Sequence, residues 1–102
     1  MAKTVEYHSS ARADFDESFD WYAQRSVGAA IGFVAAVDEA IDKIAADAGR
    51  FPSTHGGCQY CSLNRYPFRL VFRDEPERLI VVAVAHAKRR PGYWHGRTDL
   101  ES

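Results

Sequence analysis

The chain has 102 residues, a formal net charge of -1, and 46% hydrophobic and 13% aromatic residues. This length gives room for a single domain over residues 1–102, and the apolar content is too high for a disordered protein. The first twenty residues contain no apolar signal segment, and the longest strongly apolar run, residues 79–85, is far shorter than a membrane helix of roughly 20 residues. We therefore expect a cytoplasmic protein with no membrane segment.

The near-neutral total conceals an acidic half and a basic half. Residues 1–48 carry nine carboxylates against four cations, and residues 58–97 carry eight cations against three carboxylates. The basic half is expected to attract nucleic acid or an acidic protein segment. Its cations are Arg65, Arg69, Arg73, Arg78, Lys88, Arg89, Arg90 and Arg97.

The N-terminal half predicts one strand and two helices. Residues 3–8 alternate between apolar and polar side chains, which is typical of a half-buried strand. Ser9 and Ser10 then offer hydroxyls that cap the start of a helix over about residues 10–26. Gly28 interrupts the apolar periodicity, and a long apolar stripe predicts a second helix over about residues 29–48. The short connection between them predicts an antiparallel helical hairpin.

The C-terminal half changes to a period of two. It predicts strands over about residues 59–65, 68–73 and 78–86, joined by tight turns at residues 66–67 and 74–77. The last strand is apolar on both faces and is expected in the interior of the sheet. The predicted fold is α+β with the order β-α-α-β-β-β. The N-terminal strand and the helical hairpin are expected to pack on one face of a small antiparallel sheet.

The strand of residues 68–73 predicts two unlike sheet faces. Its apolar residues Phe68, Leu70 and Phe72 alternate with Arg69, Val71 and Arg73. Helices are expected on the apolar side, so the open side presents guanidinium groups. These arginines form either a solvated face or a binding surface.

A basic and aromatic tail follows over residues 87–97. Its cations and aromatic rings suit phosphate contacts with base stacking, and they equally suit docking of an acidic peptide. The alternative is that Tyr93 and Trp94 pack the tail back onto the sheet. Candidate binding residues for a protein partner, a target or phosphate are Arg65, Arg69, Arg73, Lys88, Arg89, Arg90, Tyr93 and Trp94.

His86 ends the last predicted strand, where we expect it on the same side as Ile80, Val82 and Val84. It is either a structural hydrogen-bonding residue or a general acid–base group. Cleavage of RNA by its own 2′-hydroxyl needs a base, an acid and a cation at the phosphate. If the protein is an enzyme, it is expected to be a metal-independent endoribonuclease with the catalytic set Arg69, His86 and Tyr93, His55 being the alternative histidine.

The two cysteines, Cys58 and Cys61, do not predict a metal site. A structural zinc ion takes four ligands, and no second cysteine pair is present. Positions i and i+3 of a strand face opposite ways, which also disfavours a local disulfide. No metal and no cofactor are expected.

Three strings in the basic half resemble the signature of the RelE/ParE toxins of type II toxin–antitoxin systems, in particular the branch called plasmid stabilisation proteins. The Trp21-Tyr22 pair, the helix of residues 33–44 and Phe51-Pro52 also fit, so the resemblance covers nearly the whole chain. The strings are Tyr66-Pro67-Phe68-Arg69-Leu70-Val71-Phe72-Arg73, Ile80-Val81-Val82-Ala83-Val84-Ala85-His86 and Arg89-Arg90-Pro91-Gly92-Tyr93-Trp94.

The resemblance implies a toxin that arrests growth when it is free of its antitoxin. ParE-type members poison DNA gyrase without cutting RNA, whereas RelE-type members cleave mRNA in the ribosomal decoding site. Both bind a cognate antitoxin encoded beside them, and the pair usually represses its own promoter, so operator DNA is contacted through the antitoxin. Arg69 matches the strand arginine that ribonuclease members use on the scissile phosphate. The lysines that RelE carries on the preceding strand are absent here, near Tyr60 and Ser62.

Three functions therefore stay open: gyrase inhibition, ribosome-dependent mRNA cleavage, and an attenuated toxin fold retained as a binding or regulatory partner. In each case we expect an acidic, partly disordered antitoxin segment to fold onto the basic sheet face.

Overall fold

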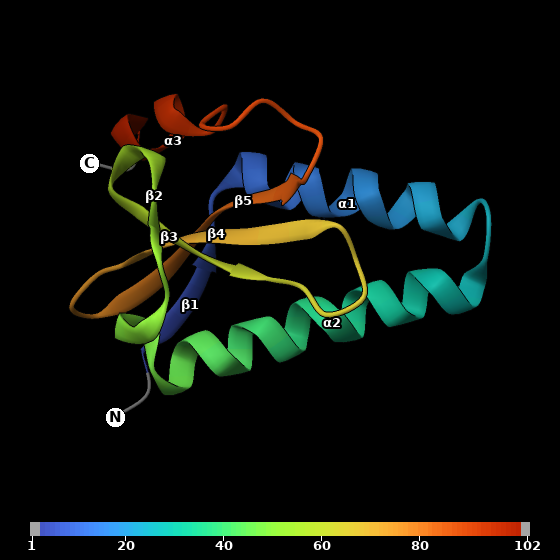
Figure 1. The fold of residues 1–102 in the computed structure, drawn as a ribbon, viewed down its shortest axis with the longest axis horizontal. Coiled ribbons are helices and arrows are strands. Elements are labelled where there is room, and N and C mark those ends of the chain that lie inside the picture. The colour runs from blue at the N-terminus through green and yellow to red at the C-terminus, as the bar shows by residue number, and fades with distance from the viewer. Residues whose placement is uncertain (1–2, 101–102) are drawn as a thin grey trace.

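The computed structural model describes residues 3–100 and confirms the α+β fold. Two long helices lie side by side against a sheet, and the C-terminal segment returns across the molecule (Figure 1). The elements are β1 (Thr4–Tyr7), α1 (Ser9–Ala23), α2 (Val27–Ala46), β2 (Ser53–Thr54), β3 (Cys58–Ser62), β4 (Phe68–Asp74), β5 (Arg78–His86) and α3 (His95–Leu100), with single 3₁₀ turns η1 (Ala48–Arg50) and η2 (His55–Gly57). No helix in the described part of the chain is long and apolar enough to cross a membrane.

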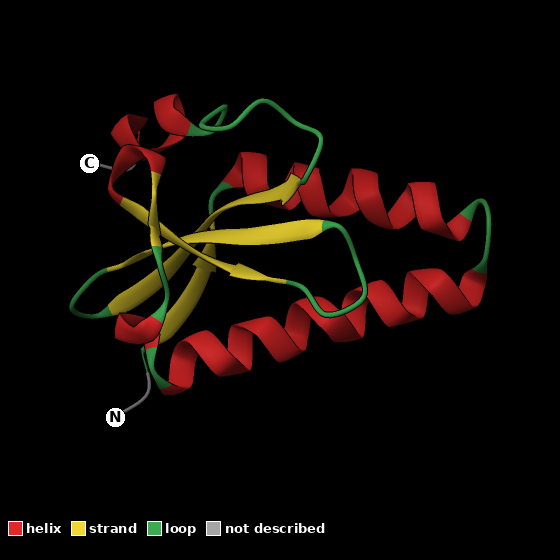
Figure 2. Ribbon diagram, in the orientation of Figure 1, coloured by secondary structure: helices red, strands yellow, loops and turns green. Residues whose placement is uncertain are grey.

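The sheet has five strands in the order β1-β5-β4-β3-β2. Strands β3 to β5 form the expected antiparallel meander, β2 adds a short strand that the sequence did not predict, and β5 lies in the sheet interior between β1 and β4. The sheet is nevertheless mixed, because β1 pairs in parallel with β5, with Thr4 opposite Arg78. Parallel pairing needs a long connection, and here the chain passes from β1 through the helical hairpin and strands β2 to β4 before it reaches β5 (Figure 2).

Side-chain caps set the helix boundaries and differ from those expected. The N-cap of α1 is His8, whose Nδ1 accepts a hydrogen bond from the Ser10 amide at 3.0 Å, so the expected serine hydroxyl cap was wrong. The Ser26 hydroxyl accepts from the Ala29 amide at 3.1 Å and starts α2 at Val27. Gly28 therefore lies in the first turn of α2 and does not separate the helices. The resulting antiparallel hairpin confirms the prediction.

The main core lies between the helices and the sheet. Phe33 of α2 and Leu70 and Phe72 of β4 are fully buried there, which confirms the predicted apolar face of β4. A second, smaller cluster on the opposite face contains Val71, Val82 and Trp94. β5 is therefore apolar on both faces because both are covered, one by helices and the other by the tail.

A β-bulge reverses the side-chain alternation in the middle of β5. Phe72 pairs with Val81, whereas the preceding Val71 pairs with Ala83, so Val82 is an extra residue. As a result Val84 packs in the helix-side cluster, while Ile80 and Val82 pack in the opposite one. The expectation that His86 shares a side with Ile80 and Val82 was wrong for this reason. Its ring lies 4.9 Å from that of Phe68, on the helix side.

Candidate functional site

The open face of the sheet presents Arg69 as expected. Its side chain is exposed, and its guanidinium carbon lies 4.3 Å from the ring centroid of Tyr60 on β3. This stacking holds the guanidinium over a rigid aromatic surface. Within the described chain, Arg69 makes no ion pair with a carboxylate. Its charge is therefore available to a partner.

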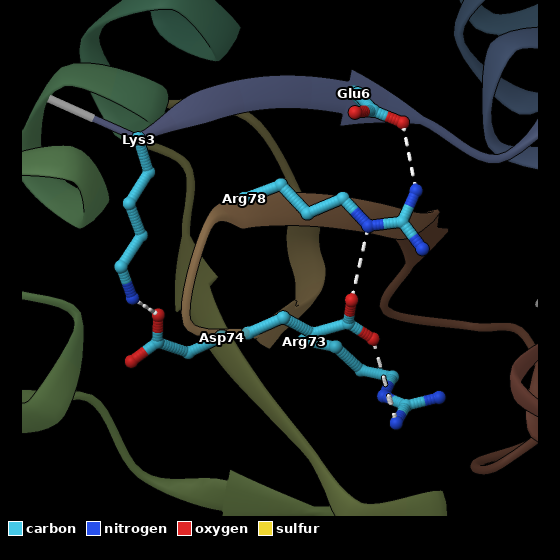
Figure 3. A network of polar contacts seen from close by, with 6 residues as sticks. Lys3, Glu6, Arg73, Asp74 and Arg78 are labelled. Carbon is cyan, nitrogen blue, oxygen red and sulfur yellow. Dashed lines mark hydrogen bonds and ion pairs between the residues drawn. The ribbon is translucent and has the colours of Figure 1, made fainter. Parts of the chain in front are cut away.

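Other arginines of the basic half form ion pairs with carboxylates of the same chain. Around the turn between β4 and β5, Arg78 donates from Nε to Glu75 and from Nη1 to Glu6, both at 2.9 Å (Figure 3). Arg73 lies 3.6 Å from the second carboxylate oxygen of Glu75. This network also includes the Lys3–Asp74 ion pair and joins β1 to the turn. It makes Arg73 a weaker binding candidate than Arg69.

The tail packs back onto the sheet. Trp94 is 4% exposed, belongs to the cluster on the open face, and donates from Nε1 to the His55 carbonyl at 3.2 Å. Gly92 allows this return with φ +79°, a conformation that favours glycine. The packing alternative for the aromatic tail residues is therefore confirmed for Trp94. The indole is unavailable for stacking on a base.

Tyr93 holds the tail to α1 through a half-buried carboxylate, Asp14, whose role the sequence did not predict. Its hydroxyl donates to Asp14 Oδ2 at 3.2 Å. Burial and, next, the Asp14 charge raise the pKa of Tyr93 to about 12. The ring centroid also lies close to two guanidinium carbons, 3.9 Å from that of Arg89 and 5.0 Å from that of Arg97. Asp14 follows the buried Ala11 by three residues, so it shares the buried face of α1, and this position was the available signal.

Asp14 and Arg97 close the part of β5 that has no neighbouring strand. Asp14 Oδ2 accepts from Arg97 Nη1 at 2.8 Å and from the Val84 amide at 3.2 Å. Arg97 Nη1 also donates to the Val82 carbonyl at 3.0 Å. The two side chains are only 11% and 17% exposed. We name this set of contacts, with Tyr93, the tail junction.

A cleft of about 560 Å³ opens beside the tail junction, between α1 and the ends of β4 and β5. Its floor is aromatic, with Trp21, Tyr22 and Phe68. Glu17 lies on the α1 wall, and the opposite wall is basic and carries His86, Lys88 and Arg89. The acidic and the basic half of the sequence therefore both contribute residues to this cleft.

His86 lines this cleft with one ring nitrogen already engaged. Its Nδ1 accepts a hydrogen bond from the Lys88 amide at 3.0 Å. A neutral imidazole that accepts at Nδ1 carries its proton on Nε2. Nε2 therefore cannot accept a proton unless the bond to Lys88 breaks. This geometry disfavours His86 as a general base.

The expected catalytic residues do not come together. Arg69 lies on the open face, His86 lies on the helix side with Phe68, and the Tyr93 hydroxyl is directed to Asp14. The bulge at Val82 is the physical reason for the separation of Arg69 and His86. His55 lies beside Trp94, at 6.2 Å between ring centroids. Within residues 58–97, the exposed cations that are not paired with carboxylates of the described chain are Arg65, Arg69, Lys88, Arg89 and Arg90.

The cysteines occupy separate surroundings, as the strand spacing predicted. Cys58 is buried in the open-face cluster and Cys61 in the helix-side cluster, and both are free thiols. Burial raises the pKa of each thiol. Among the residues that the structure describes, no three His, Cys, Asp or Glu side chains are grouped to hold a metal ion.

Comparisons with known proteins identify the family. The profile of the ParE toxin of the type II toxin–antitoxin system parDE matches residues 5–91. A solved structure described as the chromosomal ParDE toxin–antitoxin system from P. aeruginosa superposes with a TM-score of 0.70 at 22% identity, covering 83% of this chain and 96% of that one. That likeness shows a shared fold. No curated protein matches the chain. Tyr93, Trp94 and Arg97 lie beyond the matched residues. The chain belongs to the ParE toxin family of type II toxin–antitoxin systems.

Proposed function

We propose that this protein, when free of its antitoxin, arrests growth in the cytoplasm by binding and inhibiting DNA gyrase, and that it does not cleave RNA. The observation that carries the proposal is the position of Arg69 and His86 on opposite sides of the sheet. A phosphate held by Arg69 is therefore separated from the imidazole by the sheet itself. General acid–base catalysis needs the proton-transfer group within hydrogen-bond reach of the reacting atom.

The remaining candidates for proton transfer are engaged in structural contacts. The backbone amide of Lys88 donates a hydrogen bond to His86 Nδ1, and the carboxylate of Asp14 accepts one from the Tyr93 hydroxyl. A phenol with a pKa of about 12 is a poor acid near neutral pH. The family resemblance implies gyrase as the target of ParE-type members, in agreement with a site that lacks an acid–base pair.

The exposed surface suits contact with a protein. Lys88 and Arg89 line one wall of the cleft, Arg90 follows them in the chain, and all three are exposed. The loop end of the helical hairpin exposes three large apolar side chains, Trp21 at 52%, Val27 at 69% and Ile31 at 64%. An exposed apolar group beside unpaired cations is typical of a protein-binding surface.

The deciding experiment is induction of the chain without its antitoxin, with pulse labelling of DNA and protein synthesis. We expect DNA synthesis to fall first and purified protein to inhibit gyrase supercoiling without shortening ribosome-bound mRNA. An early fall in protein synthesis with mRNA cleavage would instead establish the ribonuclease alternative. If neither synthesis falls, the chain is an attenuated toxin retained as a binding partner.

Point variants sharpen this test. His86→Ala is expected to retain inhibition within about threefold, because the proposal gives the imidazole no chemical step. Arg89→Glu is expected to reduce inhibition at least tenfold by reversing a charge beside the cleft. Arg50→Glu reverses another exposed arginine, outside the residues that line the cleft, and serves as the matched control. Loss of toxicity in His86→Ala with antitoxin binding intact contradicts the proposal.

A further inference from the structure

The exposed cations of residues 58–97 gather at one end of the sheet. Arg69, near the start of β4, lies opposite Ala85, near the end of β5, and the Ala87 amide donates to the Pro67 carbonyl at 2.8 Å. The turn between β3 and β4 therefore lies beside the loop that follows β5 (Figure 1). We name the exposed cations of this turn, of β4 and of this loop the basic end: Arg65, Arg69, Lys88, Arg89 and Arg90.

Three cations of the basic end lie outside the cleft. Lys88 and Arg89 line the cleft, whereas Arg65, Arg69 and Arg90 are not among its lining residues, and we name these three the outer cations. Arg69 projects from the open face of the sheet, away from the helix side that carries the cleft floor. None of the outer cations forms an ion pair with a carboxylate of the described chain. The proposed contact of the cleft with a protein target therefore leaves their charges unused.

Arg65 holds a backbone conformation that an arginine rarely adopts. Its φ of +71° lies in the left-handed region, and no other non-glycine residue of the described chain has a positive φ. Glycine or asparagine adopts this conformation at lower cost, because the Cβ of most residues crowds the following carbonyl oxygen there. The turn itself thus gives no reason for an arginine. Backbone strain of this kind is concentrated at functional sites, and here it presents an exposed guanidinium group.

The aromatic rings beside these cations are already engaged. The guanidinium carbon of Arg69 lies 4.3 Å from the ring centroid of Tyr60. That of Arg89 lies 3.9 Å from the centroid of Tyr93, and Trp94 is buried. Proteins that bind single-stranded nucleic acid stack its bases on exposed aromatic rings. In duplex DNA the bases stack on one another and the phosphates are exposed, so a duplex can be bound by cations without a free ring.

The surface around the outer cations lacks the apolar anchors of a protein interface. The binding energy of such interfaces is concentrated in a few large, mostly aromatic side chains near the centre. The exposed large apolar side chains of the described chain are Trp21, Val27 and Ile31, and all three belong to the helical hairpin. The exposed residues between positions 62 and 69 are polar, charged or proline. Protein–DNA interfaces are more polar and more positive than protein–protein interfaces, in agreement with this composition.

We propose that Arg65, Arg69 and Arg90 bind the phosphate backbone of duplex DNA without reading its base sequence. All three are arginines, whose planar guanidinium group binds phosphate through two parallel hydrogen bonds. In the inhibited complex the cleft contacts the gyrase protein, and the outer cations contact the DNA that gyrase holds. This last statement rests on the proposed function, whereas binding of DNA by the free toxin does not.

Fluorescence anisotropy of a labelled DNA duplex, titrated with the purified full chain, tests DNA binding without gyrase. Three phosphate contacts are few, so we expect a Kd of about 10⁻⁴ M at physiological salt, the weak end of non-specific binding. Binding should strengthen at low salt and be equal for duplexes of unlike sequence. The logarithm of the binding constant should fall with the logarithm of the salt concentration, with a slope of about −0.9 for each phosphate contact.

Charge-removing variants identify the residues. Arg65→Gln and Arg69→Gln should each weaken binding at low salt at least about threefold and reduce the salt slope by about one. Arg50→Gln removes an exposed arginine outside the basic end and should leave affinity and slope unchanged. Circular dichroism checks that each variant is folded. A slope near zero, equal losses in all three variants, or tighter binding of poly-glutamate or single-stranded DNA than of the duplex overturns the inference.

Photo-crosslinking tests the contact in the gyrase complex. Ser62 on β3 is exposed and lies opposite Arg69, so a photoreactive phenylalanine in place of Ser62 shares its face and retains every cation. We expect this group to form an adduct with the DNA of the gyrase complex, and the same group in place of Arg50 to form none. Absence of a DNA adduct at position 62, in a complex that inhibits supercoiling, overturns the placement of the DNA. Binding of the free duplex without inhibition of supercoiling contradicts the proposed function and leaves DNA binding standing.

Discussion

The two faces of the sheet are held by different kinds of interaction. On the helix side, Phe33, Leu70 and Phe72 are fully buried in a continuous apolar core against α1 and α2. On the open side, cover comes from Trp94 and Tyr93, and the tail that carries them is held at the free edge of β5 by the polar contacts of Asp14 and Arg97. The helix-side core is distributed over many side chains, whereas the contacts that hold the tail on the open side depend on a few residues.

This difference separates global stability from the order of the tail. An extended core resists unfolding as a unit, whereas a segment held by a few contacts opens locally at lower free energy. The candidate target surface at Lys88 and Arg89 lies between β5 and the tail junction, so its shape depends on the weaker set of contacts. We therefore expect substitutions in the helix-side core to lower the free energy of global unfolding, and substitutions at the tail junction to lower mainly the free energy of local opening of the tail.

The largest effect is expected on the helix side. Phe33→Ala removes a fully buried ring that contacts Phe15, Tyr22 and Phe68, and should lower the free energy of unfolding by about 3–5 kcal/mol. Urea unfolding followed by circular dichroism measures the loss. A loss under about 1 kcal/mol would show that the helix-side core is not the main source of stability.

An intermediate effect is expected at the tail junction. Asp14→Ala leaves Arg97 without its carboxylate and should cost roughly 2–3 kcal/mol in tail protection, measured by hydrogen exchange of the Trp94 indole. Asp16→Ala removes an exposed carboxylate of the same helix, paired with Arg12, and should change stability by less than about 0.5 kcal/mol. Equal effects from both variants contradict the structural role of the junction.

The smallest effect is a change of stability with pH. The folded pKa of Tyr93, about 12, lies above its usual value of 10.0, so the neutral phenol stabilises the folded protein. This contribution is fully present below pH 10 and is lost as the pH rises toward 12. Tyr93→Phe should flatten this part of the unfolding profile, and Asp14→Asn should lower the pKa of Tyr93 in an ultraviolet titration. If the free energy of unfolding of Tyr93→Phe varies with pH in the same way as that of the unaltered protein, Tyr93 is not the group responsible for the loss of stability above pH 10.

The sequence alone determined the order of elements and the helix-side core. Apolar periodicity located the two helices, and the alternation in residues 68–73 assigned the apolar side of β4 and the exposed side of Arg69. The paired aromatics of the tail indicated packing as one alternative, and Trp94 confirms it. These features are local, because a single element and its repeat carry the information.

Only the tertiary structure decided where the candidate groups meet. An unpaired strand segment recruits Asp14 and Arg97, which are 83 residues apart, and neither spacing nor composition encodes that distance. The bulge at Val82 depends on strand register, yet it moves His86 to the other face and separates it from Arg69. The parallel pairing of β1 with β5 also depends on register, and it directs the backbone amides of Val5 and Tyr7 away from β5 while their side chains pack against the core. Register and long-range contacts arise when elements pack together, so the chemistry of this surface follows from the assembled sheet.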